Sequence, residues 1–389
     1  MPAEYSGNRA VKVAVVFGTR PEAIKVAPVI KALQAASDFE CATISTGQHK
    51  EMLAQVLELF EIQPDCDLQV MRHDQSLSGL TARLSEAIGD ALDKVKPDVT
   101  LVQGDTTTAL VGALCSFYAG IPVGHIEAGL RTDSLFTPFP EEANRRLIST
   151  LSTFHFCPTE KNLQQLRLEE TSKALSSVTG NTVIDALQME VRRQEQTGDR
   201  ERLREVLAKS IGPNWWQDPY ILLTTHRREN LGSGLEQICE AIQVLATRLP
   251  DEFQVIATVH KNPNVREVLE RELAGNPRVR LIEPQPYSEF LALMRDSTLI
   301  LSDSGGVQEE APALGKPVLV LRETTERTEG VEAGTVRLVG TNSDAIVSST
   351  MRLVSSVEEY ESMARALNPY GDGQASARIL EILRSSKQA

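Results

Sequence analysis

Short apolar runs alternate with turns and amphipathic stretches along most of the chain. The first run, Val11–Phe17, is rich in valine and leads through Gly18-Thr19-Arg20 to a helix predicted to open at Pro21, where proline is favoured because its missing N–H would have no helical partner. Further strands are predicted at Cys41–Ser45, Val99–Gln103 and Pro122–Ile126, and helices at His49–Phe60, Ser78–Val95 and Thr106–Ala119. Strands that are apolar on both faces and alternate with helices predict a parallel sheet covered on both sides.

A second series of the same kind follows a polar stretch. The segment Arg192–Lys209 is highly charged, and Gly212-Pro213-Asn214 interrupts it. Strands are then predicted at Tyr220–Thr225, Phe253–Val259, Val279–Ile282, Thr298–Ser302 and Pro317–Leu321, with helices between them. The pattern predicts two doubly wound α/β halves that meet near residues 185–215 and face each other across a cleft. Because ligands of open parallel sheets bind beyond the carboxyl ends of the strands, we expect the chemistry at the strand ends.

Composition points to a globular enzyme. The 389 residues are enough for about two domains, and 41% apolar with 24% charged residues is typical of a folded protein. With 40 Lys and Arg against 53 Asp and Glu, the formal charge of −13 argues against broad nucleic-acid binding but permits a local basic pocket for one small anion. No apolar run reaches the ~18 residues of a membrane span. Because Met1–Ala10 lacks the apolar core of a signal peptide, we expect a cytoplasmic protein.

The cysteines give no sign of a disulfide framework or a zinc site. They are odd in number, scattered, and never spaced as CxxC. We expect small buried thiols that pack as hydrophobic groups. The five are Cys41, Cys66, Cys115, Cys157 and Cys239.

Two glycine-containing strand ends have the character of anion sites. After the first strand, Gly18-Thr19 leads into a helix N-terminus, whose amides and dipole favour an anion, and Arg20 and Lys25 add positive charge. The loop Ser302–Gly306 lies between another strand and helix, and its small residues would let backbone amides approach a phosphate. The alternatives are solvated surface cations and a tight structural turn. Neither GxGxxG nor GxxxxGK[ST] is present, so the sequence predicts no dinucleotide cofactor and no P-loop.

The other polar strand ends carry titratable groups. His226 follows the strand Tyr220–Thr225 and precedes two arginines, which suits a diphosphate whose departure the histidine could assist by protonation. Asp105, Glu127 and Glu141 come from neighbouring elements of the first half and are candidates for a paired acid and base. Each could instead be a helix cap or a salt-bridge partner. No HExxH motif or histidine-rich cluster accompanies them, so we expect no metal ion.

Taken together, these stretches resemble the non-hydrolysing UDP-N-acetylglucosamine 2-epimerases over nearly the whole chain. The matching motifs are FGTRPEAIKVAP, TGQHKEML, QGDTTTAL, GHIEAGLRT, PFPEEANR, TGNTVIDAL, THRREN, VHKNPNVRE, LSDSGGVQEEAPALGKPVL, AGTVRLVGT and NPYGDG. The resemblance implies two Rossmann-like domains around a cleft in the glycosyltransferase-B arrangement. By this resemblance we expect an N-terminal domain at 1–190, a UDP-binding domain at 191–370, and a C-terminal segment at 371–389 whose helix, Ala375–Leu383, crosses back to the first domain.

The resemblance also implies an activity and its residues. The family interconverts UDP-N-acetylglucosamine and UDP-N-acetylmannosamine by expelling UDP to leave 2-acetamidoglucal and then adding it back, and it needs no cofactor. By motif, Asp105, Glu127, Glu141 and His226 match its catalytic groups. The substrate-binding positions are Arg20, Lys25 and the loop Ser304-Gly305-Gly306 for the diphosphate region, Glu310 for the ribose, and the backbone of Phe290 for uracil.

Some members bind a second UDP-N-acetylglucosamine as an activator, and Gln48, His49 and His260 stand in the matching motifs. The chain departs from relatives at Lys50-Glu51, at Arg72-His73-Asp74 and at Thr328, which replaces a proline. The family expectation is a homodimer. Three alternatives stay open: a hydrolysing epimerase that releases N-acetylmannosamine and UDP, a UDP-sugar glycosyltransferase of the same fold, and a silent sugar-nucleotide sensor.

Overall fold

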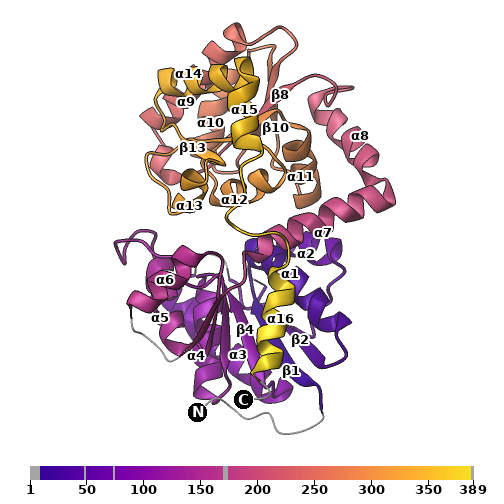
Figure 1. Cartoon of the computed structure of the whole chain (residues 1–389), viewed down its shortest axis with the longest axis vertical. Coiled ribbons are helices and arrows are strands. Elements are labelled where there is room, and N and C mark those ends of the chain that lie inside the picture. The colour runs from indigo at the N-terminus through magenta and orange to yellow at the C-terminus, as the bar shows by residue number, and fades with distance from the viewer. Residues whose placement is uncertain (1–8, 48–49, 73–74, 170–173, 387–389) are drawn as a thin grey trace. The chain divides into compact units, whose positions relative to one another are not determined.

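The computed structural model describes residues 9–47, 50–72, 75–169 and 174–386 of the chain (Figure 1). The chain forms two compact units. Unit 1 comprises residues 1–189 together with 370–389, and unit 2 comprises residues 190–369. The boundary at residue 190 falls inside a helix, α7 (Thr182–Thr197), rather than in an irregular linker. The charged stretch Arg192–Lys209 is accordingly helical for most of its length, in the end of α7 and in α8 (Asp199–Ile211).

Unit 1 is built on a seven-stranded parallel sheet. Its order is β3-β2-β1-β4-β5-β6-β7. The chain therefore winds outward from β1 in one direction and then from β4 in the other, and the adjacent ends of β1 and β4 form a topological switch point. The strands are β1 (Val11–Phe17), β2 (Phe39–Ser45), β3 (Cys66–Asp67), β4 (Val99–Gln103), β5 (Val123–Ile126), β6 (Phe154–Cys157) and β7 (Leu175–Val178).

Helices connect these strands, as parallel pairing requires. They are α1 (Arg20–Ala35), α2 (Lys50–Leu59), α3 (Leu77–Val95), α4 (Thr107–Tyr118), α5 (Glu141–Leu151), α6 (Glu160–Leu168) and α7. The last helix of the chain, α16 (Ala375–Ser385), packs against α1 (Figure 1). Its first amides, on Ala375 and Ser376, donate to the Asp185 carboxylate of α7 at 3.1 and 2.8 Å, so a side chain from elsewhere in unit 1 caps this helix.

Unit 2 repeats the plan with six parallel strands. Their order is β10-β9-β8-β11-β12-β13, with the switch point between β8 and β11. The strands are β8 (Tyr220–Thr225), β9 (Gln254–Val259), β10 (Val279–Ile282), β11 (Leu299–Ser302), β12 (Val318–Val320) and β13 (Val336–Leu338). The helices are α8, the 3-10 turn η1 (Arg228–Asn230), α9 (Ser233–Arg248), α10 (Pro263–Leu273), α11 (Tyr287–Asp296), α12 (Gly305–Ala313), α13 (Thr328–Glu332), α14 (Ser343–Ser355) and α15 (Val357–Ala364).

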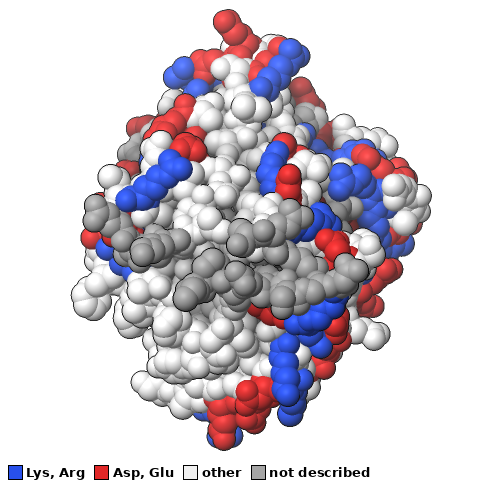
Figure 2. All heavy atoms as spheres, turned by 60° about the horizontal axis from the view of Figure 1, so that its bottom comes forward, with Lys and Arg blue, Asp and Glu red and all other residues white. Residues whose placement is uncertain are grey.

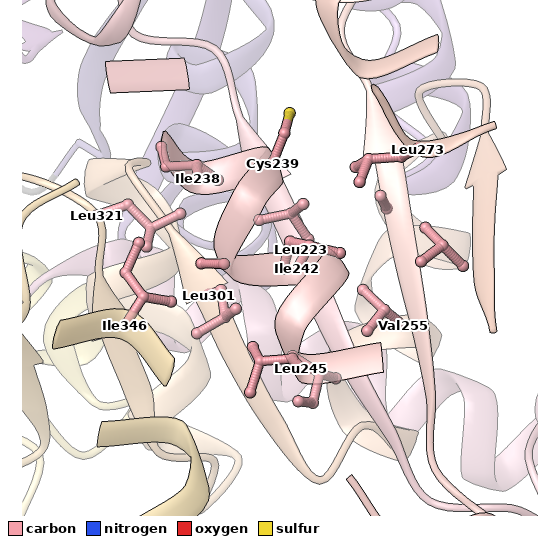
Figure 3. Packing of buried hydrophobic residues seen from close by; sticks show 14 of the residues in the cluster. Leu223, Ile238, Cys239, Ile242, Leu245, Val255, Leu273, Leu301, Leu321 and Ile346 are labelled. Carbon is pink, nitrogen blue, oxygen red and sulfur yellow. The ribbon is translucent and has the colours of Figure 1, made fainter. Parts of the chain in front are cut away.

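In the core of unit 2, the apolar face of α9 packs on the central strands of the sheet. Ile238, Ile242 and Leu245 recur on one face of α9 at intervals of three and four residues. They pack over Leu223 of β8 and Leu301 of β11, and all five side chains are fully or almost fully buried (Figure 3). Burial of such side chains, about 1.5–3 kcal/mol each, holds the helix on the sheet.

Acidic and basic residues are mixed on one face of the molecule (Figure 2). Figure 2 shows acidic and basic side chains close together on the face that it presents, without a continuous basic area. Among the described residues, none of the helices has the length and apolar character needed to cross a membrane. All five cysteines are free thiols, and burial raises the pKa of Cys41, Cys157 and Cys239 to about 12, which leaves these three unreactive.

Candidate active site

The site residues predicted from the sequence follow the carboxyl ends of strands at or next to each switch point. In unit 1, Arg20 follows β1, Asp105 follows β4 and Glu127 follows β5. In unit 2, His226 follows β8 and Ser304 follows β11. Within each unit these residues therefore lie on the side of the sheet where the strands have their carboxyl ends, which we call the carboxyl edge. Ligand sites of doubly wound folds lie on this side.

Glu127 has an unusual backbone conformation and pairs with a partly buried cation. Its φ of 69° lies in the left-handed region, which costs a residue with a side chain about 1–3 kcal/mol. Lys25 Nζ lies 2.8 Å from Oε1 and 2.6 Å from Oε2, and the side chain of Gln103 donates a further hydrogen bond to Oε2. Lys25 thus pairs with both carboxylate oxygens of Glu127. Sequence reasoning did not single out Gln103.

Asp105 is fixed through both its side chain and its backbone. The guanidinium of Arg145 donates to Oδ2 through Nε at 2.8 Å, and its Nη2 lies 2.7 Å from the same oxygen. The amide of Asn144 donates to the main-chain carbonyl of Asp105 at 2.8 Å. The preceding Gly104 has a φ of 71°, which glycine adopts without strain, and this turn directs Asp105 away from the strand.

The two adjacent glutamates that open α5 have different surroundings. Glu141, the predicted catalytic residue, is partly exposed in the first turn. Glu142 is fully buried and accepts hydrogen bonds from Arg145 Nη1 at 3.2 Å, Arg146 Nε at 2.8 Å and the Thr132 amide at 3.0 Å. Glu142 is therefore structural. The residues of α5 that contact Asp105 are Asn144 and Arg145, about one helical turn after Glu141.

A pair of buried histidines underlies this edge. His125 Nε2 lies 2.7 Å from the carbonyl of Gly104, and since a carbonyl only accepts, Nε2 carries the proton. His155 contacts the Ser149 carbonyl in the same way at 3.1 Å. Burial lowers the pKa of His125 to about 3 and that of His155 to about 4, so both are neutral near pH 7.

The start of α1 corrects one expectation. We expected its free backbone amides to form an anion site, but Glu22 Oε2 already accepts from Gly18 and Thr19 at 3.1 and 2.7 Å, and Thr19 Oγ1 accepts from the Glu22 amide at 3.4 Å. This capping box fills the helix terminus with an internal carboxylate. Burial raises the pKa of Glu22, in opposition to its hydrogen bonds from Thr106 and Thr19. The diphosphate contact of the Arg20 side chain stays a prediction.

In unit 2, a buried aspartate that sequence reasoning did not select organises the loop of His226. Asp303 is fully buried and lies directly after β11. Its carboxylate accepts from the amides of His226 and Arg227 at 3.0 and 2.9 Å, and His226 Nδ1 lies 3.4 Å from Oδ1. Thr225 Oγ1 and Asn230 Nδ2 also donate to Oδ2, at 2.7 and 3.0 Å. Burial lowers the pKa of His226 and the charge of Asp303 opposes that effect.

The N-terminus of α12 is open where that of α1 is closed. Its N-cap, Ser304, makes no side-chain capping bond. A Cβ on Gly305 would lie 2.5 Å from Arg327 Cζ, so only glycine lets that guanidinium pack onto the first turn. Arg327 donates to Glu309 at 2.9 Å and also pairs with Glu326. Burial opposes ionisation of Glu326, yet Arg327 and Arg322 outweigh it and lower its pKa to about 2. A helix N-terminus with a serine and a nearby arginine is typical of anion sites, and the diphosphate contact expected at Ser304 and Gly305 stays a prediction.

The remaining predicted positions are also placed, apart from two. Glu310 is buried and accepts from the Tyr287 hydroxyl at 2.7 Å. The amide of Phe290 donates to the Pro286 carbonyl at 2.9 Å within the first turn of α11. The ring of His260 stacks on that of His226 with centroids 5.6 Å apart. Gln48 and His49 lie outside the described residues.

Sequence reasoning missed Gln103, Arg145, Asp303 and Arg327. Asp303 lies inside the loop that we selected, and Arg327 lies in the polar segment after β12, so both stand near strand ends. Gln103 is the last residue of β4 itself. Arg145 lies one turn into a helix and gave no such signal.

Comparison with known proteins agrees with this arrangement. A family model described as UDP-N-acetylglucosamine 2-epimerase matches residues 31–384. The UDP-N-acetylglucosamine 2-epimerase of Escherichia coli K12 is 52% identical over 380 residues, covering 97% of this chain and 99% of that protein. The crystal structure of the Neisseria meningitidis enzyme, bound to UDP-GlcNAc, is similar with a TM-score of 0.90 and 49% identity over 96% of this chain and all of that one. A glycosyltransferase from Rickettsia africae, with a TM-score of 0.60 and 15% identity over 98% of this chain and 99% of that one, shares the fold alone, and this confirms the predicted fold class.

Proposed function

The chain belongs to the UDP-N-acetylglucosamine 2-epimerase family, and we propose that it interconverts UDP-N-acetylglucosamine and UDP-N-acetylmannosamine without releasing the free sugar. Family membership confirms the resemblance stated from the motifs and makes the protein an isomerase. The product would supply N-acetylmannosamine units for cell-surface polysaccharide. The free cysteines and the nucleotide-sugar substrate support a cytoplasmic place of action.

The proposed route avoids a proton transfer that would otherwise be prohibitive. The hydrogen on C2 is not next to a carbonyl and is barely acidic. When the C1–O bond breaks, its electron pair leaves with UDP, and the electrons of the C2–H bond form the C1=C2 double bond of 2-acetamidoglucal as a base removes the proton. The opposite face of C2 then receives a proton and UDP returns to C1. Anti elimination places the base and the departing diphosphate on opposite faces of the ring.

The residues at the carboxyl ends of the strands differ between the two units, and this difference supports separate roles for the units. The edge of unit 1 carries Asp105, Glu127 and Glu141, which are proton carriers suited to C2. The edge of unit 2 carries the open N-terminus of α12 with Ser304 and Arg327, which suits the diphosphate. We assign the UDP contacts to unit 2 and the sugar contacts to unit 1. This contrast is the single observation that carries the proposal.

The binding residues follow from the same assignment. Arg20 and the loop Ser304-Gly305-Gly306 would bind the diphosphate, with His226 donating a proton to it as charge develops. Glu310 would accept from the ribose hydroxyls. The pairing of Lys25 with both oxygens of Glu127 favours their action as one unit. The backbone of Phe290, through an atom other than its amide, would contact uracil.

Two further expectations of the family also enter the proposal. We propose that a second UDP-N-acetylglucosamine activates the enzyme through Gln48, His49 and His260, and the stacking of His260 on His226 offers a direct route for that effect. A sigmoidal dependence of rate on substrate would support the activator. We also propose a homodimer, for which Phe117, Tyr118 and Leu147 provide exposed apolar surface on the packed helices α4 and α5.

Product identity tests the proposed function. The purified full chain is incubated with UDP-N-acetylglucosamine and followed by proton NMR. UDP-N-acetylmannosamine in equilibrium with substrate is expected. Free N-acetylmannosamine with UDP would identify a hydrolysing enzyme, and unchanged substrate that nonetheless binds would identify a sensor. Transfer of the sugar only in the presence of an added acceptor would identify a glycosyltransferase.

A further inference from the structure

The two oxygens of the Asp105 carboxylate have unequal surroundings. Oδ2 receives Arg145 Nε at 2.8 Å and lies 2.7 Å from Nη2. Within the described ranges, Oδ1 accepts no hydrogen bond. Glu127 differs, since Lys25 contacts both of its oxygens. The side chain of Asp105 is 26% exposed and that of Arg145 only 7%, so the cation lies behind the carboxylate on its protein side.

Arg145 is itself held in place from the opposite direction. Its Nη1 donates to the fully buried Glu142 at 3.2 Å, and Glu142 is fixed by the Thr132 amide at 3.0 Å and by Arg146 Nε at 2.8 Å. The guanidinium therefore bridges a structural carboxylate and a reactive one. A planar fork bonded at both ends cannot rotate without losing hydrogen bonds.

The main chain of Asp105 is restrained as well. Asn144, the residue before Arg145, donates to the Asp105 carbonyl at 2.8 Å, and His125 donates to the Gly104 carbonyl at 2.7 Å. The backbone and one side-chain oxygen of Asp105 are thus fixed by buried groups. Of the two side-chain oxygens, Oδ1 is the one without a protein partner among the described residues.

We propose that Arg145 is a positioning residue that binds Oδ2 of Asp105 and thereby presents Oδ1 to C2 of the sugar. This inference rests on the proposed function. When Asp105 acts as the base, the C2 proton is transferred to Oδ1 and the C–H electrons enter the double bond. In the reverse direction Oδ1 carries a proton that has exchanged with solvent, and this proton is transferred to C2 as the double bond is consumed. Arg145 touches neither the proton nor the substrate, and its contribution is to fix the geometry in which the transfer occurs.

Neighbouring arginines of α5 provide a matched test. Arg145→Lys keeps a cation beside Glu142 but removes the fork on Oδ2, whereas Arg146→Lys changes a residue that contacts Glu142 and not Asp105. We expect kcat of Arg145→Lys to fall by about 10²-fold, the worth of well-positioned proton transfer, with KM for UDP-N-acetylglucosamine changed less than about threefold. Arg146→Lys should keep both constants within about threefold of the wild type.

Two readouts separate positioning from a general structural role. Guanidinium ion at millimolar concentration should restore part of kcat to Arg145→Ala, because it can occupy the vacated site. In the double variant Arg145→Lys with Asp105→Asn, the losses should not multiply, because Arg145 acts only through that carboxylate. Multiplied losses, or kcat of Arg145→Lys and Arg145→Ala within about threefold of wild type, would overturn the inference. Failure of the wild-type chain to epimerise would instead remove the proposed function.

Discussion

Asp303→Asn tests whether one buried carboxylate builds the His226 loop. The carboxylate accepts from four donor groups: the Thr225 hydroxyl, the amides of His226 and Arg227, and the side chain of Asn230. Asparagine retains one oxygen for the three donors that lie on Oδ2 alone, which are the Thr225 hydroxyl, the Arg227 amide and the Asn230 side chain. The N–H of His226, which donates to both oxygens at 3.0 Å, keeps its contact with Oδ2 and loses the one with Oδ1.

The magnitude follows from the loss of charge. Hydrogen bonds to an ionised acceptor contribute about 1.5–3 kcal/mol, against about 0.5–1.5 kcal/mol for neutral ones. Weakening three bonds by about 1 kcal/mol each predicts a loss near 3 kcal/mol in the free energy of unfolding. Because His226 also loses the partner of its Nδ1, kcat should fall by about 10²-fold in protein that is still folded.

Urea unfolding measures this effect within one unit. Both tryptophans, Trp215 and Trp216, belong to unit 2, so their fluorescence reports that unit. Asp344→Asn, at an exposed site in α14, is the control and should cost less than about 1 kcal/mol. If Asp303→Asn changed the unfolding free energy by no more than the control and left kcat intact, our account of this loop would be wrong.

Three other perturbations have defined outcomes. The free energy of unfolding of unit 1 should be highest above pH 6.5 and fall by about 1.4 kcal/mol per pH unit and per histidine as the pH drops toward 4. The cause is that His125 and His155 stay neutral in the folded state while the unfolded chain takes up protons. Calorimetry across this range should show a slope that His155→Gln reduces, and a flat profile would contradict the prediction. Gly305→Ala should displace Arg327 and weaken UDP binding by at least about tenfold in calorimetric titration with little change in melting temperature, whereas unchanged affinity would remove Arg327 from the anion site. Arg20→Ala should reduce the UDP-induced rise in melting temperature and lower kcat more than ground-state binding, because negative charge on the diphosphate grows as the C1–O bond breaks. Arg20→Lys should restore only part of the lost kcat. Unaltered kinetics in the alanine variant would make Arg20 an ordinary surface residue.

The sequence predicted the elements that obey strong local rules. Apolar runs such as Val11–Phe17 and Tyr220–Thr225 became strands with the predicted bounds, because both faces of a central parallel strand are buried. The short strands β3, β6, β7 and β13 were missed. β3 and β7 are partly exposed edge strands, and their few residues, like those of β6 and β13, show no distinct periodicity.

The site could be predicted where chemistry coincides with a strand end, and not where it depends on packing. Asp105 and His226 follow apolar runs, so their position in the chain reveals them. The occupation of the α1 terminus by Glu22 depends on a side-chain rotamer, and the approach of Arg327 to Gly305 joins two distant segments. Neither contact has a local sequence pattern.

The proposed elimination requires that the C1–O bond of the substrate breaks and re-forms during epimerisation. Substrate with ¹⁸O in the bridge between C1 and the β-phosphate is turned over in D2O and analysed by NMR. Elimination and re-addition of UDP should place deuterium at C2 of both epimers and move ¹⁸O from the bridging to the non-bridging positions of the β-phosphate. Deuterium at C2 with ¹⁸O retained wholly in the bridge would contradict the elimination route, and so would epimerisation without deuterium.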